Sequence, residues 1–96
     1  MPGERVIAVD LGASSGRVIG VRLSDGVVSI DSMHRFPNGP VRREVNGRGR
    51  WCWDIDAIME GVIEGITLVA AKGPVHSIAV DSWAVDYGLI DEDGQL

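Results

Sequence analysis

The chain has 96 residues, of which 45% are hydrophobic and 24% charged, the composition of an ordinary soluble globular domain. Its net charge of −5 argues against a nucleic-acid partner, and no apolar run is long enough to suggest a membrane partner. The single Cys52 excludes an intramolecular disulfide, which fits a cytoplasmic location. His34 and His76 have no acidic or thiol companions at ligand spacing, so a zinc site is not expected.

The first forty residues predict three antiparallel strands. Arg5–Leu11 is an almost continuous apolar run, typical of a strand that is buried on both faces. Arg17–Leu23 and Val27–Phe36 alternate in polarity, and Ser24-Asp25-Gly26 between them indicates a hairpin turn. Pro37–Arg50 has no usable periodicity and is expected to form a loop or a short excursion.

An amphipathic helix is predicted from Ile55 to about Lys72, because apolar residues recur there at spacings of three and four. Asp54 stands where an N-cap is expected, and Gly73 with the proline after it would end the helix. Gly61 and Gly65, four residues apart, would let another backbone approach one side of the helix closely.

The rest of the chain predicts two further strands. Val75–Val80 and Val85–Ile90 are the fourth and fifth, and a turn at 91–94 follows. Trp51 and Trp53, before the helix, are expected to be anchored in the core. The order β-β-β-α-β-β favours an α/β fold with a mixed sheet and packed helices. The last residues read as a strand running into a turn with nothing to cover it, so we expect a piece of a larger protein.

The segment Val6–Arg17 predicts a nucleotide site. An apolar strand ends in Asp10, and a carboxylate at a strand end can hold a hydrated magnesium ion. The small and donor residues that follow are Gly12, Ala13, Ser14, Ser15, Gly16 and Arg17. Their backbone and side-chain donors could surround a triphosphate such as that of ATP. The loop lacks the lysine of a P-loop and no helix follows it; the alternative is a polar turn beside a capping aspartate.

A second group of polar and aromatic residues gathers at the end of the predicted fourth strand. Its members are Asp81, Trp83, Asp86 and Tyr87. An indole can lie against the apolar face of a sugar ring, and carboxylates accept hydrogen bonds from hydroxyl groups. The alternative is that the aromatic rings pack in the core while the aspartates stand in turns. For the whole group we favour contact with a sugar.

Four motifs carry a family resemblance. They are DLGASSGR at 10–17, HRFPNG at 34–39, WDID at 53–56 and DSWAVDYGLID at 81–91. In this order, over almost the whole chain, they resemble the FGGY family of carbohydrate kinases. The resemblance implies the ribonuclease-H-like fold of the actin, hexokinase and sugar kinase superfamily, with 1–96 as an incomplete first part of the first kinase domain.

The resemblance also implies roles for single residues. Asp10 matches the acid associated with Mg²⁺, and Ala84 matches a substrate-contacting position at which glycine is common in the family. The residues that match the ATP-binding segment are Ala13, Ser14, Ser15, Gly16 and Arg17. The catalytic aspartate of the family is expected downstream of Leu96, so the chain contains no catalytic residue.

The function that the resemblance implies for the whole enzyme is transfer of the γ-phosphoryl group of ATP to the 1-hydroxyl of L-rhamnulose. The alternatives are a family kinase for another sugar, such as L-fuculose or D-xylulose, and an actin-like module that binds nucleotide without transfer. The chain by itself is expected to be inactive, to bind nucleotide weakly, and to self-associate through exposed sheet edges and apolar faces.

Overall fold

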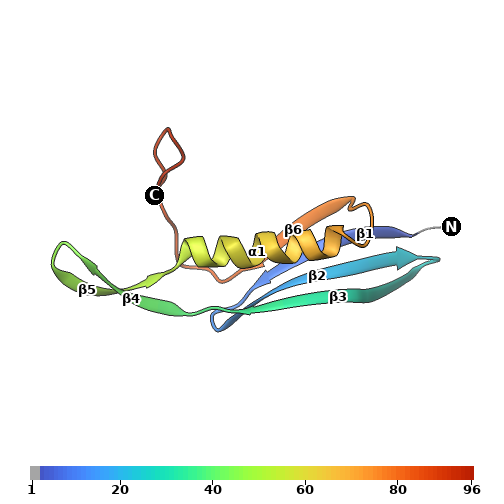
Figure 1. Cartoon of the computed structure of the whole chain (residues 1–96), viewed down its shortest axis with the longest axis horizontal. Coiled ribbons are helices and arrows are strands. Elements are labelled where there is room, and N and C mark those ends of the chain that lie inside the picture. Colours follow the sequence, from blue (N-terminus) through green and yellow to red (C-terminus); the bar gives the residue numbers. More distant parts are fainter. Residues whose placement is uncertain (1–2) are drawn as a thin grey trace.

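The computed structural model describes residues 3–96, which form one four-stranded sheet, one two-stranded hairpin and one helix (Figure 1). In chain order the elements are β1 (Glu4–Leu11), β2 (Ser15–Ser24), β3 (Val27–Pro37), β4 (Pro40–Val45), β5 (Arg48–Trp53), α1 (Ile55–Ala70) and β6 (Ser77–Ser82).

The main sheet has the strand order β3-β2-β1-β6. β1, β2 and β3 form the predicted antiparallel meander, and β6 lies parallel to β1 after the crossover through α1. The β2–β3 turn is Asp25-Gly26, where both residues have positive φ, as a two-residue hairpin requires. The predicted mixed sheet with a packed helix is confirmed, and the predicted fourth strand is β6, shifted by two residues toward the C-terminus.

The helix begins as predicted, with the side chain of Asp54 accepting a 3.1 Å hydrogen bond from the N–H of Ala57. It ends at Ala70, and the chain turns at Gly73, whose φ is +151°. α1 packs on one face of β1, β2 and β3 (Figure 1). The buried hydrophobic core between them consists of Ile7, Val9, Val18 and Phe36 from the sheet and Val69 from the helix.

Two helix glycines allow this close packing. A Cβ at Gly61 would lie 2.7 Å from the ring of Phe36, and one at Gly65 would lie 2.5 Å from the Cβ of Val18. Both distances are shorter than any ordinary carbon–carbon contact, so a close approach at these glycines is confirmed, although the atoms that approach are side-chain atoms of the sheet and not its backbone.

The prediction of a loop at 37–50 is wrong, because β4 and β5 form an antiparallel hairpin there. Its turn is Asn46-Gly47, and both residues have positive φ. All residues of the two strands except Val41, Cys52 and Trp53 are exposed, so the hairpin has no core face. A pair of strands without a buried face needs no alternation of apolar and polar residues, and for this reason periodicity did not reveal it.

Two further predictions fail. Trp51 is 67% exposed and is no core anchor; instead, the guanidinium carbon of Arg42 lies 5.6 Å from the centre of its ring. The strand predicted at 85–90 does not form, because the chain leaves the sheet after Ser82 and turns at Val85, whose φ is +70°. The turn at 91–94 does form, closed by a 3.0 Å hydrogen bond from Gly94 N–H to Asp91 O.

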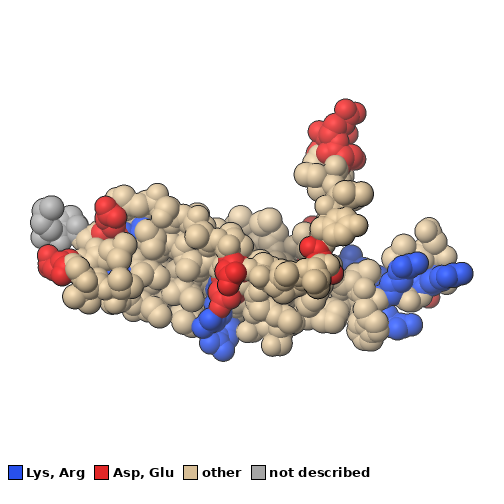
Figure 2. Space-filling view, turned by 180° about the vertical axis from the view of Figure 1, so that it is seen from behind, with Lys and Arg blue, Asp and Glu red and all other residues tan. Residues whose placement is uncertain are grey.

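The molecule is elongated, with extents of 59 × 30 × 23 Å. The β4–β5 hairpin and the C-terminal residues project away from the helix and sheet (Figure 1). Seen from behind, the projecting C-terminal tip is acidic, the hairpin is basic, and most of the surface between them is uncharged (Figure 2). In the described part of the chain, no helix is long and apolar enough to cross a membrane.

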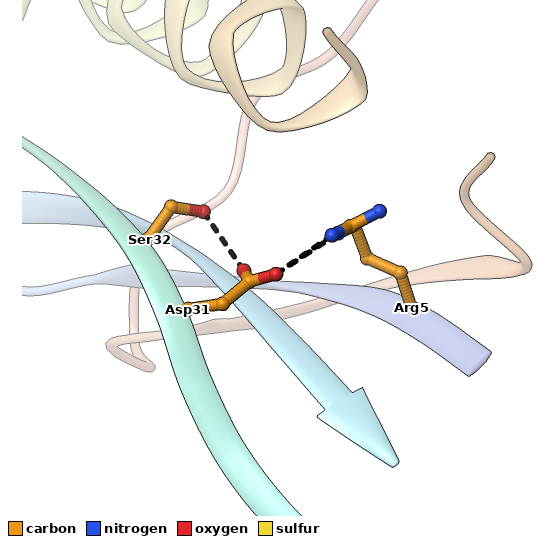
Figure 3. Close-up of polar contacts among 3 residues, drawn as sticks. All are labelled: Arg5, Asp31 and Ser32. Atoms are coloured by element: carbon orange, nitrogen blue, oxygen red, sulfur yellow. Dashed lines mark hydrogen bonds and ion pairs between the residues drawn. The ribbon is translucent and has the colours of Figure 1, made fainter. Parts of the chain in front are cut away.

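A half-buried ion pair joins β1 and β3, the two outer strands of the meander (Figure 3). Arg5 on β1 donates to one carboxylate oxygen of Asp31 on β3, through Nε at 3.2 Å and Nη2 at 2.8 Å. Ser32 donates to the other oxygen at 3.2 Å. The hydrogen bond from Arg5, more than any other contact, lowers the pKa of the Asp31 carboxyl below its usual value, and the smaller effect of desolvation opposes it.

Candidate nucleotide and sugar site

The β1–β2 hairpin brings Asp10 and Arg17 together. The two residues are direct cross-strand partners, and Arg17 donates to Oδ2 of Asp10 through both Nε, at 3.1 Å, and Nη2. Each side chain is 37% exposed. A carboxylate suited to a magnesium ion and a guanidinium suited to phosphate therefore stand side by side, partly exposed, at one end of the two central strands of the sheet.

The turn between the strands offers backbone donors. Gly12 N–H donates to Ser15 O at 2.9 Å and closes the turn. Ala13 and Ser14 at its tip are exposed, and within residues 3–96 their N–H groups donate no hydrogen bond. These two donors and the Ser14 hydroxyl are accessible to an anion beside Arg17.

Asn38 anchors this turn, a contact that sequence reasoning missed. Its side-chain amide donates to Gly12 O at 2.8 Å, and its backbone N–H donates to Ser14 O at 3.2 Å. The residue lies within the motif at 34–39 that carried the family resemblance. The motif was the available signal, but the contact joins positions 26 residues apart, which no local pattern predicts.

Packing in the core explains why the residue at position 16 is a glycine. It is buried, and a Cβ at this position would overlap the ring of Phe36 on β3. Its small size thus serves the core beneath α1, on the face of the sheet opposite to Arg17.

The register of β6 places Asp81 next to Asp10. The two are direct partners across the parallel β1–β6 pair, so their side chains leave the same face of the sheet. Arg17, Asp10 and Asp81 form one row across β2, β1 and β6, near the carboxyl ends of the two parallel strands. Such ends are where ligands commonly bind in open α/β sheets.

The donor set of this row fits magnesium. Mg²⁺ in phosphoryl-transfer sites takes one or two carboxylates and completes its shell with water and phosphate oxygens. Asp10 and Asp81 could supply those carboxylates. Among residues 3–96 no cluster of three or more acidic, histidine or cysteine side chains forms a cage that would hold a metal by itself.

Trp83 lies in a second region, beyond the end of β6. A cavity of about 680 Å³ is lined there by residues that include Trp53, Ser82, Trp83, Asp86 and Tyr87. Its size is within the usual range for small-molecule pockets. Ala84 and Asp81, both predicted to contact substrate, do not line it. Of the three predicted substrate residues, the structure places Trp83 in the cavity and Asp81 with Asp10.

Asp86 joins two aromatic rings of this cavity. Its Oδ2 accepts a hydrogen bond from the indole N–H of Trp83 at 2.8 Å and another from that of Trp53 at 3.0 Å. The two ring centres are 4.3 Å apart, with an angle of 35° between the planes. Trp53 and Asp86 are 33 positions apart in the sequence, so only the fold could reveal the shared acceptor.

No protein-family model matches the chain. It is 41% identical over 88 residues to a rhamnulokinase of Bacillus subtilis (strain 168), a match that covers 91% of this chain and 17% of the relative. It is 40% identical over 94 residues to the rhamnulokinase of Bacteroides thetaiotaomicron, covering 97% of this chain and 19% of the relative.

A rhamnulokinase of Pectobacterium carotovorum subsp. carotovorum is 39% identical over 98 residues, covering 99% of this chain and 19% of the relative. The chain therefore spans less than a fifth of the length of the curated relatives it matches. Over nearly all of its own length, this chain is similar to one part of these rhamnulokinases.

Proposed function

We propose that the protein to which this chain belongs is a carbohydrate kinase of the FGGY family that phosphorylates L-rhamnulose at its 1-hydroxyl with ATP. The observation that carries the proposal is the identity of about 40% to rhamnulokinases across nearly the whole chain. In this proposal residues 1–96 are the N-terminal part of the first kinase domain, in a cytoplasmic enzyme. The strand order β3-β2-β1-β6, with α1 as the crossover, supports the ribonuclease-H-like fold.

The chain would contribute one side of the cleft. Asp10 would hold Mg²⁺ through its water shell, and Arg17 would contact phosphate oxygens. The exposed turn and its flanks, Gly12, Ala13, Ser14, Ser15 and Gly16, would form the site of the ATP phosphates, with the backbone N–H groups of Ala13 and Ser14 as its main donors. On the sugar side the proposed contacts are Trp83, Ala84 and Asp81.

Bound Mg²⁺ and ATP supply the electrophilic phosphoryl group, and this chain's residues position it. Before ATP arrives, Arg17 neutralises Asp10. A phosphate chain would compete for the guanidinium and leave the carboxylate oxygens facing the hydrated cation. The base that accepts the hydroxyl proton is proposed to lie in a part of the relatives' length that this chain does not cover.

A chimeric enzyme tests the proposal. The segment of Bacillus subtilis rhamnulokinase that this chain matches is replaced by the chain, and ADP release is measured with ATP, Mg²⁺ and each of L-rhamnulose, L-fuculose and D-xylulose. We expect turnover with L-rhamnulose above the other two sugars, and no turnover by the chain alone. In the chimera, Asp10→Asn should lower kcat at least about tenfold.

The control is Asp25→Asn, which removes an exposed carboxylate from the β2–β3 turn at the far end of β2. It should leave kcat unchanged. A folded chimera that prefers another sugar would reassign the substrate, and one that binds ATP without any transfer would support the non-catalytic alternative.

A further inference from the structure

Asp86 occupies an unusual position between two tryptophans. An indole N–H can only donate, and the ionised carboxylate can only accept, so both hydrogen bonds are charge-assisted. Both bonds end on the same oxygen, Oδ2. The two N–H groups must therefore converge on one point, which fixes the edges of both rings.

Stacking alone would leave the rings less constrained. Offset aromatic pairs tolerate a range of displacements with little change in energy. The rings of Trp53 and Trp83, 4.3 Å apart, could slide over each other if only their faces were in contact. With both N–H groups bound to Asp86, that sliding would break at least one hydrogen bond.

The backbone conformation between Trp83 and Asp86 also indicates that these two residues are held in place. Val85, between Ala84 and Asp86, has a φ of +70°, a region that β-branched residues rarely adopt. Strain of this kind persists only where neighbouring contacts hold the chain in place. The hydrogen bonds of Trp83 and Asp86 involve residues on both sides of this turn.

The hydrogen bond between Trp53 and Asp86 also connects two separate segments of the chain. Trp53 is the last residue of β5, directly before the cap of α1, whereas Trp83 and Asp86 follow β6. Among the described residues, the Trp53–Asp86 bond is the one side-chain hydrogen bond between the segment after β6 and the rest of the chain.

We propose that Asp86 is a positioning residue whose carboxylate orients the indoles of Trp53 and Trp83 as one wall of the sugar pocket. Its role in sugar binding rests on the proposed function. Asp86 is thus assigned no proton transfer and no contact with the reacting atoms. Its effect on a sugar passes through the ring face of Trp83.

Circular dichroism of the 96-residue chain tests, without any sugar, whether Asp86 orients the indoles of Trp53 and Trp83. Two indoles held this close give an exciton couplet in the far ultraviolet; the exposed Trp51 is replaced by Phe in every sample to remove its contribution. We expect Asp86→Ala to abolish the couplet. Asp86→Asn should keep most of it, because the amide oxygen still accepts. Asp93→Ala, at an exposed carboxylate of the next turn, is the matched control.

Kinetics of the chimeric kinase test whether the orientation of the two indoles affects sugar binding. Asp86→Ala should raise KM for L-rhamnulose about tenfold, because the Trp83 ring is no longer held in place against the sugar, while KM for ATP stays unchanged. Asp86→Asn should restore most of the sugar affinity. A couplet that survives Asp86→Ala overturns the proposal, and so does a lost couplet with an unchanged KM for the sugar.

A chimera that phosphorylates no sugar at all gives a different result. It overturns the proposed function and the sugar-binding role together, while the couplet of the chain still decides whether Asp86 orients the indoles. The two failures are therefore distinguishable.

Discussion

At the scale of single residues, Asn38 holds the turn that carries the exposed backbone donors. Its side-chain N–H and its backbone N–H are bonded to the carbonyl oxygens of Gly12 and Ser14. A turn fixed in this way presents its outward N–H groups in one geometry, and an anion would then bind without a further ordering cost.

The variant Asn38→Asp tests the hydrogen bond from the Asn38 side chain to Gly12 O. The variant keeps the shape of the side chain but replaces the donating amide with a carboxylate oxygen, which repels the carbonyl oxygen of Gly12. We expect amide hydrogen exchange of Gly12 to become about tenfold faster, measured by NMR, because the turn opens more often. Asn46→Asp is the matched control, since Asp tolerates the positive φ of that exposed turn. Equal exchange of Gly12 in the two variants would contradict the anchoring role.

Asp31 gives the chain a stability that depends on pH. Because the hydrogen bond from Arg5 lowers the pKa of its carboxyl in the folded state, the unfolded chain binds the proton more readily. The stabilisation is fully present above the unfolded pKa of about 3.9 and is lost as pH falls through the lower folded pKa.

Asp31→Asn should therefore lower the free energy of unfolding by about 1 kcal/mol at neutral pH, measured by urea denaturation. The difference from the unmodified chain should shrink as pH falls below about 4. Asp93→Asn, which removes an exposed carboxylate, serves as control. If the difference stays constant down to about pH 2, the ion pair is not its source.

At the scale of elements, the contact between α1 and the sheet depends on glycine. Alanine at position 65 would gain about 1 kcal/mol of helix propensity, but its Cβ would meet the Cβ of Val18 at 2.5 Å. That atom is not the end of a flexible side chain, so the helix must move away from the sheet.

Gly65→Ala should lower the free energy of unfolding by about 1–2 kcal/mol, because overpacking outweighs the gain in propensity. Gly39→Ala is the matched control: nothing lies within 4 Å of a Cβ there. Urea denaturation measures both. A stabilised Gly65→Ala variant would mean that the helix and β2 are not in close contact.

Except for β6, whose residues are all exposed, the elements that the sequence predicted well are those with a buried face. The meander and α1 carry apolar residues at regular spacing, because each must cover the same core. The β4–β5 hairpin has no such face, although its Asn46-Gly47 turn was a usable signal that the absence of periodicity obscured. The strand expected at 85–90 shows the opposite error: apolar residues were present, but no neighbouring strand pairs with them.

The candidate site was also predictable only in part. Asp10 and Arg17 are close in sequence and joined by one hairpin, so their pairing follows from the predicted strands. The contacts of Asn38 and Asp86 join segments 26 and 33 residues apart. They depend on the register and packing of the whole sheet, which local patterns do not contain.

At the scale of the whole molecule, much apolar surface is uncovered. The radius of gyration is 16.3 Å, whereas a compact domain of this length would have about 12–13 Å. In the described part of the chain α1 does not pack on β6, whose Ile78 and Val80 are 49% and 63% exposed on the helix side. On the other face of the sheet, Ile30 and Met33 are exposed as well.

The free edge of β6 is the surface on which self-association is predicted. Among residues 3–96 the strand pairs only with β1, all six of its residues are exposed, and its one charged residue, Asp81, stands near its C-terminal end. The opposite edge, β3, has a register shift opposite Gly20/Val21 and carries Asp31 and Arg35. A second copy of the chain should therefore add to β6 rather than to β3.

Light scattering across a range of concentrations should show the average mass of the chain rising above that of a monomer. Val80→Lys should keep the chain monomeric, because a charge on β6 must be desolvated when another strand pairs with it. Val27→Lys is the matched control: Val27 is 62% exposed against 63% for Val80, but it lies at the start of β3. It should associate like the unmodified chain. A monomeric unmodified chain at every concentration would rule out association through β6, and monomeric behaviour of both variants would place the cause in net charge.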